Sequence, residues 1–401
     1  MAKLSSAKLS IKDLDLKNKT VFLRVDFNVP LAPGGKEITS DKRIRASLPT
    51  IQYAIEHGAA VILASHLGRP KGKKNPEMSL APVAARLGEL LGRPVSMAPD
   101  SVGQEVAAMR PKPGEVLLLE NLRFHAEEEA NDPEFSKQLA SLADIYVNDA
   151  FGTAHRAHAS TVGMVSYLPL AAAGLLVDRE IEWLTRVTSH PERPCVALLG
   201  GAKVSGKIEV IQNLMNVVDS LLIGGAMAYT FLRAKNEPTG RSLVEEDKID
   251  LARRLLTTAG NKLVLPLDHV VVREIKTGAQ HEVVTRIGPD QIAVDIGPKT
   301  VEEYARIISA AKTIIWNGPM GIFEMPPFDT GTVELAKAVA GSGAVSLVGG
   351  GDSEKAIKSA GLSDKISHVS TGGGASLEFL GGVDLPGVAA LTDKVPAEAG
   401  H

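Results

Sequence analysis

Short runs that are apolar on both faces recur along this 401-residue chain, and each run ends in a polar or glycine-rich cluster. Buried strands of a parallel sheet have this pattern, because helices cover both faces of such a sheet. The predicted strands are Val21–Phe27, Ala60–Ser65, Glu115–Leu119, Ile145–Val147, Cys195–Leu199, Leu221–Ile223, Lys262–Leu265, Thr313–Trp316 and Ala344–Val348.

Amphipathic patterns with helical spacing lie between these runs. Alternating strands and helices predict an α/β fold, and the length exceeds what one doubly wound sheet needs. We therefore expect two Rossmann-like three-layer domains with parallel sheets, residues 1–178 and 179–384, joined by a helical hinge at Leu175–Val187. The other predicted helices are Arg43–His57, Leu80–Leu91, Pro133–Leu142, Lys207–Met215, Ala226–Ala234, Val301–Ala310 and Gly331–Val339.

Charge and cysteine content exclude several classes of protein. Lys and Arg number 44 against 47 Asp and Glu, so net charge gives no reason to expect a nucleic-acid partner. No apolar stretch approaches the roughly 20 residues of a membrane span, and Met1–Asp15 does not resemble a secretory leader. The single cysteine, Cys195, is expected to be buried, and a cytoplasmic location is expected. The tail Pro396–His401 is expected to be frayed.

Cationic side chains follow the predicted strands of the first half. Because ligands bind beyond the carboxyl ends of parallel strands, these side chains are expected at one edge. Guanidinium groups bind phosphate and carboxylate in a bidentate manner, so the pattern predicts capture of a small, multiply charged anion, with Asp26 and Asn28 available for a hydroxyl. Solvated surface charge is the weaker alternative for such a series. The cations are Arg43, His66, Arg69, Arg123 and Arg156.

Two neighbouring patterns have simpler interpretations. His155 and His158 could suggest a metal pair, but no cysteine or carboxylate cluster completes a metal site there. The run Glu127–Glu129 is expected to lie on a solvent-exposed face.

Glycine is concentrated in the second half, which holds 26 of the 38 glycines. The segment Gly200–Ile208 matches a phosphate-binding P-loop except at its last position, where Ile208 replaces the Ser or Thr that would bind Mg²⁺. A strand, small residues, Lys203 and Lys207 before a helix still predict a turn that faces phosphate.

Three further glycine clusters follow strands of the second half. Gly225 lies in a strand-to-helix turn suited to a flat base, and Glu324, after Gly321, could hold ribose hydroxyls. In Gly349–Ser353, backbone donors would face phosphate and Asp352 is the natural Mg²⁺ ligand. Each cluster taken singly could be a tight turn, whereas several in one domain favour a nucleotide site.

An anion site in one domain and a nucleotide site in the other predict phosphoryl transfer. This reaction requires close approach of the substrates and positive charge, which Arg43, Lys203 and Lys207 could supply. Two alternatives are a P-loop-like NTPase, which Ile208 argues against, and a non-catalytic nucleotide-binding protein on the same fold.

Six motifs make the chain similar to one known family. They are Arg24–Pro30, Ser65–Pro70, Asn148–His158, Gly200–Ile208, Trp316–Glu324 and Gly349–Ser353, in family order over nearly the whole chain. The sequence resembles phosphoglycerate kinase. The resemblance implies reversible, Mg²⁺-dependent transfer between ATP and the carboxylate of 3-phosphoglycerate, giving ADP and 1,3-bisphosphoglycerate, by a hinge-bending monomer of glycolysis.

The resemblance also implies roles for individual residues. Its C-terminal segment, about 385–401, would pack back on the first domain. Gly206 and Ser353 depart from the usual family residues without altering the expected chemistry. Catalysis would fall to Arg43, Lys203 and Lys207. Phosphoglycerate would be bound by Asp26, Asn28, Arg43, His66, Arg69, Arg123 and Arg156. The nucleotide would be bound by Lys207, Gly225, Gly321, Glu324, Gly350, Gly351, Asp352 and Ser353, with Asp352 on the metal.

Overall fold

The strands of the first half form one parallel sheet in a computed structural model that describes residues 7–394. All four strands predicted there are present, and two short ones, β3 and β6, extend the sheet at its edges. The order across the sheet is β3-β4-β2-β1-β5-β6. The strands are β1 (Thr20–Arg24), β2 (Ala60–Ala64), β3 (Ser96–Met97), β4 (Val116–Leu118), β5 (Ile145–Asn148) and β6 (Ala171–Ala173).

A second parallel sheet repeats this plan in the second half. Its order is β15-β14-β13-β7-β8-β9, and its five predicted strands are all present. The α/β fold class with two parallel sheets is thus confirmed. The strands are β7 (Cys195–Leu199), β8 (Ser220–Ile223), β9 (Leu263–Val264), β13 (Thr313–Asn317), β14 (Val345–Gly349) and β15 (His368–Val369).

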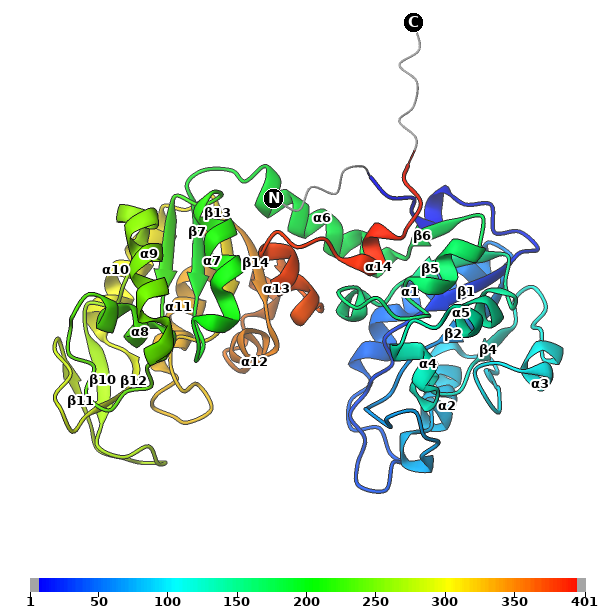
Figure 1. Ribbon diagram of the computed structural model, residues 1–401, viewed down its shortest axis with the longest axis horizontal. Helices are drawn as coiled ribbons and strands as arrows, with labels where there is room; N and C mark the ends of the chain where they lie inside the picture. Colours follow the sequence, from blue (N-terminus) through cyan, green and yellow to red (C-terminus); the bar gives the residue numbers. More distant parts are fainter. Residues whose placement is uncertain (1–6, 395–401) are drawn as a thin grey trace, which may run out of the picture. The chain divides into compact units, whose positions relative to one another are not determined.

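The chain divides into two units, each built around one parallel sheet (Figure 1). One unit runs up to Ile181 and resumes at Asp384, and the other spans Glu182–Val383. Helix α6 (Leu175–Ser189) contains the boundary. Helices of the first unit are α1 (Lys42–Glu56), α2 (Ala81–Leu91), α3 (Gln104–Ala108), α4 (Ala126–Glu129), α5 (Pro133–Ala140) and α14 (Pro386–Ala389). Those of the second are α7 (Ile208–Met215), α8 (Met227–Ala234), α9 (Ile249–Ala259), α10 (Pro298–Ser309), α11 (Thr330–Gly341), α12 (Gly351–Ser359) and α13 (Gly374–Leu380).

The C-terminal segment returns to the first unit through backbone hydrogen bonds. The Gly387 N–H donates to the Ala154 carbonyl, and the Thr392 N–H donates to the Ala171 carbonyl, at 2.8 and 2.9 Å. The Lys8 ammonium adds bonds to the carbonyl oxygens of Ala389 and Leu391. The expectation for the tail Pro396–His401 lies outside the described residues.

Strand order reverses once in each sheet. In the first, β2 lies on one side of β1 and β5 on the other; in the second, β8 and β13 flank β7. Right-handed crossovers carry the connections away in opposite directions at such a reversal, and ligands of open α/β sheets bind beyond the strand ends there. The fold therefore marks the carboxyl ends of β1 and β5, and of β7 and β13, as the places for ligands.

A small antiparallel sheet in the second unit was not predicted from the sequence. It consists of β10 (His269–Val272), β11 (His281–Val284) and β12 (Ile292–Ile296), in the order β11-β10-β12. Strands β10 and β11 are only four residues long, and β11 is largely exposed, so β11 lacks the buried apolar pattern of a parallel strand. Strand β10 is mostly buried and was missed.

Two other expectations can be compared with the structure. Cys195 is buried as predicted, and burial raises the pKa of its thiol to about 12. Between residues 7 and 394, no helix is both long and apolar enough to span a membrane.

Candidate functional site

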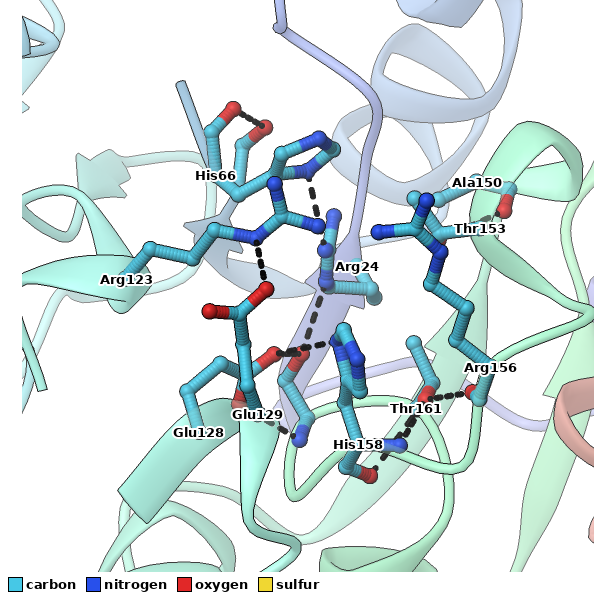
Figure 2. Close-up of polar contacts among 12 residues, drawn as sticks. Arg24, His66, Arg123, Glu128, Glu129, Ala150, Thr153, Arg156, His158 and Thr161 are labelled. Atoms are coloured by element: carbon cyan, nitrogen blue, oxygen red, sulfur yellow. Dashed lines mark hydrogen bonds and ion pairs between the residues drawn. The ribbon is translucent and has the colours of Figure 1, made fainter. Parts of the chain in front are cut away.

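The register of the first sheet places several strand ends at one level. Arg24, the last residue of β1, lies opposite Ala64 of β2 and Asn148 of β5. The segments that follow these strands therefore leave from one edge. Figure 2 shows the heads of Arg24, His66, Arg123 and Arg156 pointing toward one another at this edge. We call these four residues, with His158, the basic cluster.

Arg24 is buried and is held by groups on several sides. Its Nε donates to the Ser160 hydroxyl at 2.8 Å, its Nη1 donates to the Val25 carbonyl, and its Nη2 lies 3.3 Å from Nδ1 of His66. Because its N–H groups donate to protein acceptors, Arg24 has a structural role in the basic cluster.

The other arginines differ in their freedom to meet a ligand. Arg123 is 4% exposed and donates from Nη1 to the Gly68 carbonyl at 2.9 Å, while its Nε lies 3.5 Å from Glu129. Arg156 is half-buried and donates to the His155 ring at 3.2 Å. Arg69 is exposed. The cluster thus combines fixed cations with more accessible ones.

Asp26 and Asn28 connect the loops after β1 to their neighbours. Both oxygens of Asp26 accept from Arg43 Nη1, at 2.7 and 2.6 Å. The Asn28 side-chain oxygen accepts from the Gly68 N–H at 2.9 Å, which ties the first loop to the second. The structure brings Arg43 to Asp26, and half of its side chain remains exposed to solvent.

Positive charge and burial together keep the imidazoles of the basic cluster neutral. Burial, with Arg24 and Arg123 nearby, holds the pKa of His66 well below its usual range. The same causes lower the pKa of His158 to about 4. Both rings are therefore uncharged at neutral pH.

One sequence expectation near this cluster is wrong. Glu127 and Glu129 are exposed as expected, but Glu128 is fully buried beneath the basic cluster. Its carboxylate accepts from the Ser160 N–H at 2.9 Å and from the Ser160 hydroxyl. Because α4 is one turn long, only one member of the run can face inward.

The second sheet places its glycine clusters at one level too. Asn317, at the end of β13, lies opposite Leu199 of β7 and Gly349 of β14, and Leu199 lies opposite Ile223 of β8. Glycines follow Leu199, Ile223, Asn317 and Gly349, so four glycine-containing turns share one edge.

Lys207 reaches across the strand-order reversal of the second sheet. Its ammonium donates to the backbone carbonyl of Asn317 at 2.9 Å and to the side-chain oxygen of the same residue. Burial lowers the pKa of Lys207 to about 7, an effect that Asp352 opposes. An ammonium group with a pKa near 7, next to glycine-containing turns that can accommodate a phosphate, is suited to binding an anionic ligand.

The turns around Asn317 are locked together by backbone and hydroxyl contacts. The Gly318 N–H donates to the Ser353 hydroxyl at 2.7 Å. A Cβ on Gly225 would lie 2.4 Å from the Gly201 nitrogen, so close backbone approach alone requires glycine there. Gly350 has φ +91° and precedes α12, whose first N–H groups are left for a ligand.

The remaining predicted nucleotide residues lie at the surface of this unit. Lys203 and Glu324 are exposed, and Gly321 packs against Asp295 and Phe328. Asp352 lies in the first turn of α12 with its side chain 56% exposed, 3.3 Å from Lys355. Among the described residues, no group of three or more His, Cys, Asp or Glu side chains could hold a metal.

Two residues that organise these sites were not among the predicted site residues. Arg24 is the last residue of the buried strand β1, and a lone cation in an apolar run was the signal that could have identified it. Asn317 ends β13, and its role depends on Lys207, which lies 110 positions away in sequence. Only the fold brings that pair together.

Comparison with known proteins matches one family along nearly the whole chain. The family model described as phosphoglycerate kinase matches residues 11–383. This chain belongs to the phosphoglycerate kinase family. A phosphoglycerate kinase of Solibacter usitatus is 72% identical over 386 residues, covering 96% of this chain and 99% of the relative. That of Koribacter versatilis is 57% identical and covers 97% and 100%.

Solved structures of phosphoglycerate kinases agree with the fold. The structure from Coxiella burnetii has a TM-score of 0.89 at 44% identity and covers 96% of this chain and 98% of the other. The structure from Pyrococcus horikoshii OT3 has a TM-score of 0.82 at 36% identity, with the same coverage. The chain is therefore a glycolytic kinase that transfers a phosphoryl group to a carboxylate, with 3-phosphoglycerate and ATP as its small-molecule substrates. The P-loop alternative is not favoured.

Proposed function

We propose that the two units of this phosphoglycerate kinase divide the substrates between them. The basic cluster, with Asp26, Asn28, Arg43 and Arg69, binds 3-phosphoglycerate. The turns around Lys207 and Asn317 bind the nucleotide. The observation that carries this proposal is that the basic cluster lies at the strand-end edge of the first sheet, and that Lys207 contacts Asn317 at the strand-order reversal of the second, where ligands of such folds bind.

The nucleotide half would use backbone and side-chain donors together. The N-terminus of α12, with Gly350, Gly351 and Ser353, offers N–H groups to phosphate. We assign Gly225 and Gly321 to the base side of the nucleotide and Glu324 to the ribose. These residues lie in the segments that follow β8, β13 and β14.

Magnesium fits this site as an ion carried by the nucleotide. Asp352 lies in the first turn of α12, which also contains Glu354, and Mg²⁺ typically uses one or two carboxylates with phosphate oxygens and waters. When bound, the ion would neutralise phosphate charge. Asp352 would hold it after giving up its contact with Lys355.

Transfer itself requires little covalent work from the protein. The acceptor is a carboxylate that is already ionised at pH 7, so no general base is needed. Arg43, Lys203 and Lys207 would stabilise the charge of the transferring group. Because the reacting atoms must come within roughly 3–3.5 Å, we propose that the units close during catalysis by bending at α6. We further propose a cytoplasmic monomer, since each half-site is formed by this one chain.

Steady-state kinetics of paired variants test the division of substrates. Arg156→Ala should raise KM for 3-phosphoglycerate about 10-fold or more and leave KM for ATP unchanged, because a charge-assisted contact is lost from one half only. Lys207→Met should do the reverse. Arg110→Ala, an exposed arginine in the first unit, is the matched control. Equal effects of Arg156→Ala on both KM values would refute the assignment.

A further inference from the structure

Glu128 is a fully buried carboxylate to which the reaction gives no role. Both of its oxygens accept hydrogen bonds from Ser160, whose N–H donates to Oε2 at 2.9 Å and whose hydroxyl donates to Oε1, and Nδ1 of His158 lies 4.0 Å from Oε1. Burying a carboxylate is unfavourable unless it is paired and hydrogen-bonded. The role of Glu128 is therefore to be sought in the residues that it holds in place through hydrogen bonds.

Ser160 connects Glu128 to Arg24, because its hydroxyl is hydrogen-bonded to both side chains. Since the hydroxyl hydrogen of Ser160 points to Glu128, its oxygen is oriented to accept the Arg24 Nε–H at 2.8 Å. The Ser160 carbonyl also accepts from the Tyr146 hydroxyl at 2.9 Å, which fixes the residue in place. Figure 2 shows the resulting chain from Glu128 to Arg24 and on to His66.

Arg24 in turn determines which nitrogen of His66 carries the proton. Nη2 of Arg24 lies 3.3 Å from Nδ1 of His66, and a guanidinium group can only donate. Nδ1 must therefore accept, so the proton resides on Nε2. The groups that face this ring are Arg24 of β1, Arg43 of α1, Arg123 after β4, and His158, and all of them disfavour a second proton.

We propose that Glu128 is a positioning residue: through Ser160 and Arg24 it holds His66 in the tautomer that donates from Nε2 to the bound anion. The proposal rests on the assignment of 3-phosphoglycerate to the basic cluster. A neutral ring with a fixed donor suits an anionic oxygen, since it needs no reorientation when the ligand arrives.

The tautomer of His66 can be read directly by nuclear magnetic resonance. Long-range ¹H–¹⁵N spectra of the imidazoles, with His66 assigned from a His66→Gln variant, should show the Nε2–H form of His66 from pH 6 to 8 in the wild type. In Glu128→Gln an amide NH₂ replaces one acceptor opposite Ser160, whose N–H and O–H both need acceptors. We expect this variant to show a mixture of tautomers.

Kinetics give the functional readout on the same proteins. Glu128→Gln should raise KM for 3-phosphoglycerate about 10-fold and leave KM for ATP unchanged, because one oriented hydrogen bond to a charged ligand is lost. Glu127→Gln is the matched control, since it makes the same chemical change one residue away on an exposed side chain, and it should behave as wild type.

Distinct results separate the possible failures. An Nδ1–H tautomer in the wild type overturns the proposal, as does a Glu128→Gln variant with unchanged spectrum and KM. If Arg156→Ala also leaves KM for 3-phosphoglycerate unchanged, the site assignment itself has failed. Should Glu128→Gln not fold, the wild-type tautomer still tests the Arg24–His66 step, and Ser160→Ala tests the link to it by the same two readouts.

Discussion

Nucleotide affinity should fall steeply with pH because of Lys207. Its ammonium is buried against two oxygens of Asn317, and burial lowers its pKa to about 7. Only the protonated form attracts phosphate. A group whose pKa is depressed in this way is charged below pH 7 and loses its charge as the pH rises, so affinity should be lost on the alkaline side.

The size of the effect follows from that pKa. At pH 7 about half of the Lys207 side chains are charged, at pH 8 about 9%, and at pH 9 about 1%. Affinity for ADP with Mg²⁺ should therefore drop about 5-fold between pH 7 and 8, and about 50-fold between pH 7 and 9. The phosphate groups, whose pKa lies near 6, are already ionised over this range.

Isothermal titration calorimetry measures both consequences. Dissociation constants should follow the calculated fractions, and buffers of different ionisation enthalpy should reveal uptake of about half a proton at pH 7. Lys207→Arg should flatten the curve, because arginine stays charged throughout. Lys235→Arg, an exposed site on the same unit, should keep the wild-type curve. An affinity independent of pH between 7 and 9, with no proton uptake, would refute the reasoning.

Three further predictions follow from other contacts. Arg43→Ala, which removes the partner of Asp26, should lower kcat at least 10-fold with little change in KM for ATP; an unchanged kcat in the coupled assay removes Arg43 from the transition state. Asp149 is buried and its pKa is raised to about 7, so the folded state holds a proton that the unfolded state has released between about pH 4 and 7. Wild-type stability should therefore fall relative to Asp149→Asn by up to about 1.4 kcal/mol per pH unit from pH 5 to 7, as measured by urea denaturation, and parallel curves would contradict this. Ile208→Thr completes the P-loop motif and should give no gain in activity; a large gain would favour the P-loop reading.

The sequence was most informative about the parallel sheets. Runs such as Cys195–Leu199 and Ala60–Ser65 are buried on both faces, and each became a strand within a residue or two of its predicted ends. Strand β11 of the antiparallel sheet, His281–Val284, lacks that pattern, since it is largely exposed. Edge strands such as β3 are too short to carry a periodic signal.

The site was predictable where chemistry follows a strand directly. His66, Arg123 and Lys207 could be predicted as candidates because they lie in segments that follow strands, and parallel strands bring those segments to one edge. Glu128 could not be separated from Glu127 and Glu129 by composition, since burial depends on how one short helical turn meets Ser160. Tertiary packing determines which residue each cation contacts, as it does for Lys207 and Asn317.

The central claim is that each unit binds one substrate at its strand-order reversal, and hydrogen–deuterium exchange with each ligand alone tests it most directly. With 3-phosphoglycerate, protection should appear after β1, β2, β4 and β5, around His66 and Arg156. With ADP and Mg²⁺, it should appear around Lys207, Asn317 and the start of α12. Protection of the Lys207 region by 3-phosphoglycerate alone, with none near His66, would contradict the account.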